Sequence, residues 1–333
     1  MIVVAFFKNL CYNKNGELLV NFDDRNRRDF VKLATTTGDF DRYCDKYEDR
    51  IKNLHDAGFK CIDLSLYNLE KSKELLYDEK WEYNAKRIKE FAENLGMEFV
   101  QSHSPNFNPL GSDEEFEQAV EKNIRSIEIC SMLGIPNMVI HPGWNREFTK
   151  DEFHRENKKF FERLFDAAEK FNVNVLHENT TSANMPWYFP KTGAEMVEFS
   201  EYVNHPKFHS CWDTGHGNVE GAQYEELVTM GKDLYAVHIN DNRGTGDEHI
   251  IPFMGTLNMD EVMHGLADAG FSGAFTFESE SAMRWSDSWQ GRRHEFLKDS
   301  RVLNPSEELQ QALERFMYKV GKYVLTAYNE YEG

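Results

Sequence analysis

Two kinds of hydrophobic pattern alternate along the chain. Short apolar or β-branched runs predict β-strands, and segments with apolar residues three and four positions apart predict amphipathic helices. The eight predicted strands are, in chain order, residues 30–37, 60–67, 98–104, 137–143, 173–180, 208–214, 234–241 and 273–279. Helical spacing is clear at residues 43–58, 114–134 and 259–270, and each of these segments ends in glycine, the usual residue just past a helix. Eight successive βα units predict an α/β fold, the closed parallel (β/α)8 TIM barrel.

Two segments lie outside these eight units. Residues 2–22 hold two β-prone runs around Asn15-Gly16, a dipeptide that favours the tight turn of a hairpin. Residues 306–329 have the pattern of a further helix. We predict a single domain over residues 1–333, with an N-terminal hairpin within 1–24 and a C-terminal helical extension within 281–333. An open doubly wound sheet is the competing architecture, but no GxGxxG motif follows the first strand to support a dinucleotide site.

Composition narrows the classes of partner. The chain has 333 residues, enough for one barrel of about 250 residues with additions. Its 38 basic and 57 acidic residues give a net charge of -19, which disfavours nucleic acid and anionic membrane surfaces as partners. The five cysteines form no CxxC pair, and no apolar run is long enough for a signal-peptide core or a membrane span. We therefore expect a cytoplasmic protein.

Metal-ligand side chains recur where the predicted strands end. In a (β/α)8 barrel the site lies at the carboxyl ends of the strands, and alternate strand residues point inward. The last inward residues of the third to eighth strands are His103, His141, Glu178, Asp213, His238 and Glu278. Buried charges of this kind are costly unless they bind a cation, and mixed nitrogen and oxygen donors suit Mn²⁺, with Zn²⁺, Co²⁺ or Mg²⁺ as alternatives.

Such a cation can assist carbon-acid chemistry. A substrate carbonyl and its neighbouring hydroxyl chelate the ion, which stabilises an enediolate, so that a nearby carboxylate or imidazole can remove a carbon-bound proton. The predicted chemistry is that of an isomerase, an epimerase or a lyase.

Five motifs at these strand ends resemble those of the xylose-isomerase-like barrel superfamily, which contains sugar isomerases and epimerases and family 2 apurinic endonucleases. The motifs are IHPGW at 140–144, HENT at 177–180, WDTGHG at 212–217, VHINDNRGTGDEH at 237–249 and FESE at 277–280. The resemblance covers roughly residues 30–280 and implies one metal ion. Its ligands would be Glu178, Asp213, His238 and Glu278.

The resemblance also implies roles in catalysis. Glu178 and Glu278 would transfer protons on opposite faces of the sugar, and His216 and Arg243 would contact substrate oxygens. The endonuclease branch implies two further metals, with ligands His103, His141, His216, Asp247 and His249. The number of metals therefore stays open. Asp247 and His249 are also compatible with a solvated polar turn. Arg243 is also compatible with a simple ion pair to a neighbouring acid.

Tryptophans gather near the same strand ends, at positions 144, 187, 212, 285 and 289. We predict that the loops 184–190 and 283–289 form an apolar collar over a bulky ligand, with Trp144 and Trp187 as contacts; the alternative is that these loops pack on one another or on a partner. Such a collar would also suit the catalytic subunits of C-glycoside deglycosidases. These are relatives in the same superfamily that work with a small β-rich partner. There, elimination from an oxidised glycoside would use His141 or a glutamate as the base.

The sequence thus predicts a metal-dependent enzyme of isomerase or epimerase type that removes a proton from a sugar or sugar derivative, with Glu178, Glu278 and His141 as catalytic groups and His103 among the substrate contacts. Three competing functions remain: a C-glycoside deglycosidase subunit, a phosphodiesterase of abasic DNA, and a non-catalytic sugar-binding or scaffold subunit. We expect a homo-oligomer, or a hetero-oligomer with a small β-rich subunit.

Overall fold

The computed structural model describes residues 31–183, 185, 187–279, 282–283 and 304–328, and the backbone of two short strands at 11–12 and 18–19. The chain divides into two compact units, Met1–Phe30 and Val31–Gly333. In the first unit, β1 (Cys11–Tyr12) pairs antiparallel with β2 (Leu18–Leu19), which is the predicted hairpin. The Asn15-Gly16 turn lies outside the described residues, as does most of the segment between residues 280 and 303.

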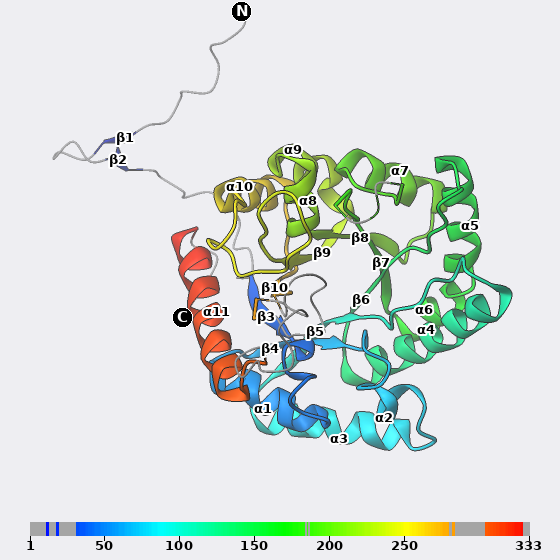
Figure 1. The fold of residues 1–333 in the computed structure, drawn as a ribbon, viewed down its shortest axis with the longest axis horizontal. Coiled ribbons are helices and arrows are strands. Elements are labelled where there is room, and N and C mark those ends of the chain that lie inside the picture. The colour runs from blue at the N-terminus through cyan, green and yellow to red at the C-terminus, as the bar shows by residue number, and fades with distance from the viewer. Residues whose placement is uncertain are drawn as a thin grey trace, which may run out of the picture. The chain divides into compact units, whose positions relative to one another are not determined.

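In the described part of the second unit, eight parallel strands close into a barrel in the order β10-β3-β4-β5-β6-β7-β8-β9 (Figure 1). The strands are β3 (Lys32–Thr36), β4 (Cys61–Ser65), β5 (Glu98–His103), β6 (Asn137–Ile140), β7 (Asn174–Glu178), β8 (Phe208–Asp213), β9 (Leu234–Ile239) and β10 (Ala274–Phe277). The barrel closes where Phe275 of β10 pairs with Leu33 of β3. The predicted (β/α)8 barrel and all eight predicted strands are confirmed.

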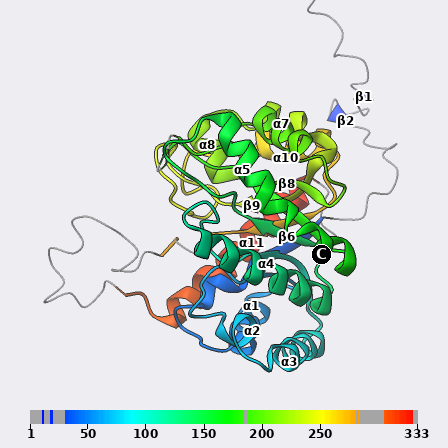
Figure 2. The same cartoon turned by 90° about the vertical axis from the view of Figure 1, so that its right-hand side faces the viewer.

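Helices surround the strands, and Figure 2, turned by 90°, shows α4 and α5 on the outside of the barrel. The helical segments are η1 (Thr37–Phe40), α1 (Tyr47–Ala57), α2 (Lys73–Leu76), α3 (Trp81–Asn94), α4 (Asp113–Leu133), α5 (Lys150–Glu162), α6 (Phe165–Phe171), α7 (Gly193–Val203), α8 (Thr214–Glu220), α9 (Tyr224–Met230), η2 (Gly231–Asp233), α10 (Met259–Ala269) and α11 (Glu307–Ala327). The glycine stops of α1, α4 and α10 are confirmed, because Gly58, Gly134 and Gly270 all have a positive φ, which glycine adopts at little cost.

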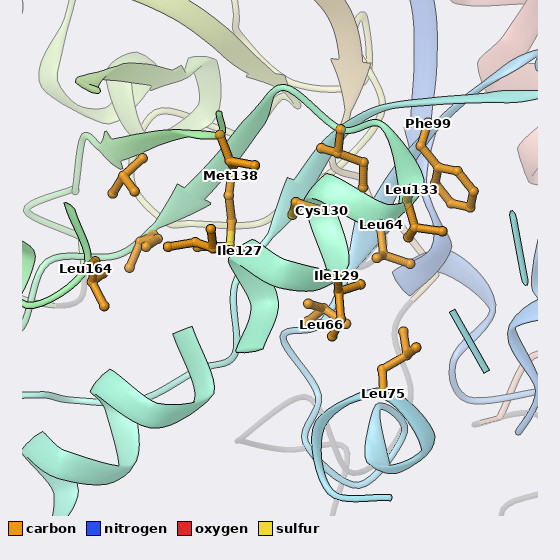
Figure 3. Close-up of a cluster of buried hydrophobic side chains, with 14 of the residues drawn as sticks. Leu64, Leu66, Leu75, Phe99, Ile127, Ile129, Cys130, Leu133, Met138 and Leu164 are labelled. Carbon is orange, nitrogen blue, oxygen red and sulfur yellow. The ribbon is translucent and has the colours of Figure 1, made fainter. Parts of the chain in front are cut away.

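Apolar side chains fill the space between strands and helices. Figure 3 shows one such region, in which Ile127, Cys130 and Leu133 of α4 pack towards Leu64 of β4 and Met138 of β6. A second, smaller cluster consists of inward-facing residues from four neighbouring strands: Val139, Leu176, Cys211 and Ala236. Each lies two positions before a predicted ligand, so this apolar layer forms the floor of the barrel mouth.

The predicted C-terminal helix is present and packs against the outside of the barrel. Met317, Val320 and Val324 of α11 are buried in the same cluster as Leu33 and Phe277. A side chain at Gly321 would overlap Leu33, so glycine lets α11 approach β3 closely. Among the described helices, none has both the length and the apolar character that crossing a membrane requires.

Candidate metal centre and active site

The predicted strand-end residues converge at the mouth of the barrel. Glu178, Asp213 and His238 end or lie within β7, β8 and β9, and Glu278 follows β10. Each of these four residues offers a ligand atom, and the four atoms lie within 4.8 Å of one another. We call these four residues the central cluster. Because three carboxylates surround one imidazole in a largely buried space, the donor set fits a divalent cation.

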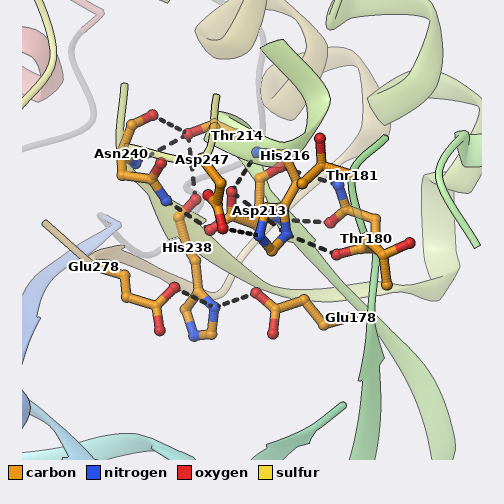
Figure 4. A network of polar contacts seen from close by, with 12 residues as sticks. Glu178, Thr180, Thr181, Asp213, Thr214, His216, His238, Asn240, Asp247 and Glu278 are labelled. Atoms are coloured by element: carbon orange, nitrogen blue, oxygen red, sulfur yellow. Dashed lines mark hydrogen bonds and ion pairs between the residues drawn. The ribbon is translucent and has the colours of Figure 1, made fainter. Parts of the chain in front are cut away.

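His238 lies in the middle of the central cluster, between its two glutamates (Figure 4). Its Nδ1 is 2.7 Å from Oε1 of Glu178 and 3.2 Å from Oε2 of Glu278. Burial opposes the charged form of His238, yet nearby anionic groups, Glu278 and Glu178 among them, hold its pKa well above the usual value. Burial also opposes ionisation of Glu178, but His238 and His141 hold the pKa of that carboxyl well below its usual value. Both glutamates therefore lie within contact of one nitrogen, on different sides of it.

Asp213 also organises the turn from β8 into α8. Its Oδ1 accepts a hydrogen bond from the backbone N–H of His216 at 2.7 Å, which caps α8, and its Oδ2 accepts one from Asn240 Nδ2 at 2.6 Å. A side chain at Gly215 would overlap the Asn240 amide, so the glycine of the WDTGHG motif leaves room for this contact. The carboxylate is thus fixed in position by both the helix cap and a neighbouring amide.

Two further groups of potential ligands flank the central cluster. His103 and His141 face each other with 3.1 Å between their Nε2 atoms, and Nε2 of His141 is 2.8 Å from Oε2 of Glu178. Nδ1 of His103 donates to the Ser104 carbonyl at 2.9 Å, which leaves the lone pair of the neutral ring on Nε2, towards the cluster. Burial lowers the pKa of His141. Burial therefore favours the neutral form of this imidazole.

The second flanking group comes from α8 and the loop after β9. Asp213, His216 and His249 can offer three ligand atoms to one ion. Asp247 lies between the two imidazoles, with Oδ2 3.4 Å from Nε2 of His216 and Oδ1 3.0 Å from Nε2 of His249. Burial would lower the pKa of His216, but Asp213 and Asp247 raise it to about 10. The structure thus places Asp247 and His249 at the centre rather than in a detached polar turn.

The predicted substrate contacts fall into two sets. His103 and His216 line a cavity of about 750 Å³ at the barrel mouth, together with His141, Asp247, His249 and Glu278. Arg243, Trp144 and Trp187 are not among the residues that line it. The side chain of Arg243 is 68% exposed and forms an ion pair with Glu248, and the rings of Trp144 and Trp187 contact each other at a centroid distance of 5.3 Å.

Among the tryptophans near strand ends, Trp212 does not face the barrel mouth. Trp212 is fully buried, and its indole N–H donates to Oε1 of Gln223 at 2.8 Å. Because Asp213 points into the barrel, its neighbour Trp212 must point outward, where it joins the apolar layer under the helices. Trp285 and Trp289 lie outside the described residues. Cys211, on the inward side, belongs to the apolar floor, and burial raises the pKa of its thiol to about 12.

Sequence reasoning missed a carboxylate beneath His238. Asp63 of β4 is buried, and its Oδ2 lies 3.7 Å from Nε2 of His238 and accepts a hydrogen bond from Gln101 at 3.1 Å. The sequence pattern that could have identified Asp63 is its position in the predicted strand KCIDLSLY, where the alternation of side chains points it into the barrel. The amides of Asn179 and Asn240, which hold Asp213, were missed as well, although each directly follows a strand that ends at the site.

Comparison with known proteins gives a family match and several relatives. The model of the family "Xylose isomerase-like TIM barrel" matches residues 51–315. The uncharacterized protein y4fM of Sinorhizobium fredii is 31% identical over 199 residues, which are 57% of this chain and 58% of that protein. A protein named probable endonuclease 4 of Geobacter sp. is 29% identical over 161 residues, 43% of this chain and 56% of that protein. The chain thus spans less than two thirds of the length of these two relatives.

Solved structures of low sequence identity share the fold. D-psicose 3-epimerase of Clostridium cellulolyticum H10, solved with D-tagatose, has a TM-score of 0.69 at 17% identity and covers 89% of this chain and 99% of its own. The 3-keto-D-glucoside 4-epimerase of E. coli has a TM-score of 0.63 at 15% identity and covers 87% and 99%. Both comparisons support the same barrel architecture.

Proposed function

Because the chain belongs to the xylose isomerase-like TIM barrel family, we propose that it is a divalent-metal-dependent enzyme that removes a proton next to the carbonyl of a sugar or sugar derivative. Among the possible reactions, we propose isomerisation or epimerisation before the alternatives. The observation that carries this proposal is the central cluster, in which three carboxylates and one imidazole offer ligand atoms within 4.8 Å of one another. The sugar epimerases among the structures of the same fold support the substrate class.

In this proposal Glu178, Asp213, His238 and Glu278 hold the ion, which we propose to be Mn²⁺, with Zn²⁺, Co²⁺ or Mg²⁺ as alternatives. When bound, such an ion supplies Lewis-acid stabilisation of the charge that develops on the carbonyl oxygen. Glu178 and Glu278, which lie on different sides of His238 (Figure 4), would act as proton acceptor and donor from different sides of the reacting carbon. The low pKa of Glu178 keeps this carboxylate ionised, so that it can accept the proton from carbon, and His141, 2.8 Å away, could take up that same proton in turn.

A second candidate function is favoured by the flanking ligand groups. His103 and His141 on one side, and His216 and His249 on the other, could hold further ions, as in a phosphodiesterase of abasic DNA. Relatives named probable endonuclease 4 point the same way. The net charge of -19 opposes a DNA substrate, because binding to phosphates rests on basic side chains.

The same site could also serve a lyase or a binding protein. Cleavage of a C-glycoside by elimination begins with the same proton abstraction, with His141 or a glutamate as the base, and would involve a small β-rich partner. A non-catalytic sugar-binding subunit would keep the ligands without turnover. We further propose a cytoplasmic location, with which the four free, buried cysteines of the described residues agree. We also propose that the protein forms either a homo-oligomer or the complex with a small β-rich partner, and sedimentation analysis would distinguish the two.

The test combines a measurement of metal content with a measurement of proton exchange on substrate carbon. Protein purified without chelator is analysed for metals, then incubated in D2O with D-psicose, D-tagatose or a 3-keto-glucoside, and exchange at carbon is followed by NMR. We expect one ion per chain and metal-dependent exchange, both lost in Glu178→Gln and retained in Glu147→Gln, a control at an exposed site in the loop after β6. Elimination would appear as release of the aglycone.

Close to three zinc ions per chain, with cleavage of abasic DNA and no exchange on sugars, would replace this function with the phosphodiesterase. Absence of exchange and release on all sugars by metal-loaded protein would overturn the proposal.

A further inference from the structure

The cavity at the barrel mouth extends well beyond the candidate metal centre. Its volume of about 750 Å³ lies in the range of roughly 300–1,000 Å³ that holds drug-sized ligands, larger than one sugar ring. Beyond the histidines and acids of the centre, its lining comes mainly from the residues around η1 and the loop after β4, with Gln310 added from α11. We call this part the side arm and define it by Asp41, Arg42, Tyr67, Asn68, Lys71 and Gln310.

The side arm is polar and carries charges of both signs. Asn68 donates its amide N–H to Oδ2 of Asp41 at 2.9 Å, and Lys71 forms an ion pair with Asp45 at 2.6 Å. The acids Asp39, Asp41 and Glu70 also line the cavity, against the two bases Arg42 and Lys71. A phosphate or carboxylate would meet this acidic excess. Neutral hydroxyl groups, which both donate and accept hydrogen bonds, match such a mixture of amides and charges.

Tyr67 lies at the junction between the centre and the side arm. Its ring centroid is 5.2 Å from that of His103 and 6.2 Å from that of His141, and the residue is 43% exposed. An exposed aromatic ring in this place offers an apolar surface to a ring that passes from the centre into the arm. By contrast, Trp144 and Trp187, which do not line the cavity, pack on each other.

Two of the three segments that form the arm lie at the ends of the barrel sequence. Residues 36–42 precede the part of the chain that matches the family model, which begins at residue 51. Gln310 comes from α11, and one turn along this helix the buried carboxyl of Glu314 lies beside Thr35 and Asp39. The arm is thus built where the start of the barrel and the C-terminal helix meet.

From this geometry we propose that the side arm binds a second, uncharged sugar ring, so that the substrate is a disaccharide or similar glycoside rather than a free monosaccharide. The reacting ring lies at the candidate metal centre, and the second ring lies in the cavity against the residues around η1 and the loop after β4. This inference rests on the proposed function, which it makes more specific.

The test uses glycosides that share one reacting ring, a 3-keto-glucosyl unit, and differ in the attached group. Metal-loaded protein is assayed in D2O with the methyl glycoside, the phenyl glycoside and the cellobiose-type disaccharide. For the wild type we expect a KM about tenfold lower for the disaccharide than for the methyl glycoside, equivalent to about 1.4 kcal/mol. Equal KM values, or the lowest KM for the phenyl glycoside, would overturn the inference while leaving the proposed function in place.

Variants locate the second ring. Asn68→Trp should fill the side arm and raise KM about tenfold for the disaccharide alone. Glu147→Trp, which adds the same bulk to an exposed position that does not line the cavity, should change neither KM. Asn68→Ala, with a smaller expected rise, serves if the larger variant melts at a lower temperature. Unchanged disaccharide KM in a folded Asn68→Trp protein would exclude the side arm.

If no glycoside or free ketose reacts, the proposed function fails. A binding measurement can then still test whether the side arm holds a second sugar ring. Calorimetry then measures the affinity of cellobiose and of glucose for the wild type and for the Asn68→Trp variant. Tighter binding of cellobiose that the variant abolishes would support the arm, and equal or absent binding would overturn it.

Discussion

At the scale of single residues, the orientation of the His238 ring decides what the central cluster can hold. Nδ1 faces Glu178 and Glu278, while Nε2 faces Asp63 at 3.7 Å and has no hydrogen-bond partner among the described residues. With an ion bound at Nδ1, among the other ligands, the one proton of the neutral ring would lie on Nε2, where it faces the Asp63 carboxylate. Outer carboxylates of this kind fix the tautomer of metal-binding histidines.

Replacement of Asp63 by Asn should therefore weaken metal binding without removing a ligand. We expect the dissociation constant for Mn²⁺ to rise by about 10–100-fold, the usual cost of losing such a partner. Titration of metal-free protein with Mn²⁺, followed by the EPR signal of the free ion, measures this change. Asp233→Asn is the matched control, because Asp233 lies beside His209 at 3.2 Å but outside the barrel. An unchanged constant in Asp63→Asn would show that Asp63 does not orient His238.

At the scale of elements, strand alternation explains what was predictable from the sequence. Because side chains of a strand alternate between faces, the convergence of Glu178, Asp213 and His238 followed from this alternation together with their positions at the ends of strands in a predicted barrel. The same parity places Trp212 outside, so that its nearness to a strand end did not bring its ring to the mouth. The position of Arg243 depends on the path of a loop and on its pairing with Glu248, which no periodicity encodes.

The attachment of α11 to the barrel depends on a buried acid. Glu314 is fully buried beside Thr35 and Asp39, and burial raises its pKa from 4.5 to about 8. Since the folded state then holds the proton more tightly than the unfolded chain, this contribution to stability is complete below about pH 4.5 and is lost as the pH rises through 8. Alkaline solution should therefore weaken the packing of this helix against the barrel.

Glu314→Gln should remove this part of the pH dependence. The variant keeps the shape of the neutral acid, so we expect its melting temperature to fall less than that of the wild type between about pH 6 and pH 9. Thermal melting at a series of pH values provides the measurement, and Glu308→Gln, at an exposed position on the same helix, provides the control. Parallel wild-type and Glu314→Gln curves would contradict the assignment.

At the scale of the whole molecule, the barrel concentrates acidic groups at its mouth in a chain of net charge -19. The central cluster alone holds three carboxylates, two of them buried. Their mutual repulsion is tolerable when a cation is bound, so the ion should contribute to folding as well as to chemistry. Anything that binds only the folded state raises its stability.

Removal of the ion should lower the melting temperature. At a metal concentration about a hundred times the dissociation constant, binding contributes about 2.7 kcal/mol, or roughly 4 °C for a chain of this size. Calorimetry of the protein before and after chelation, with metal content measured on the same samples, provides the test. Glu178→Gln should show little response to chelator. A wild-type melting temperature that stays constant after proven metal loss would rule out this contribution.

The pairing of β10 with β3 has a consequence for the order of events during synthesis. Phe275 pairs with Leu33, and α11 packs on that same leucine. Hence β3 leaves the ribosome long before its final neighbours exist, by roughly tens of seconds at ordinary rates of translation. During that interval its edge can pair with other chains. The barrel can close only after β10 has emerged, and α11 covers this seam later still, so we expect the nascent chain to need the protection of chaperones until then.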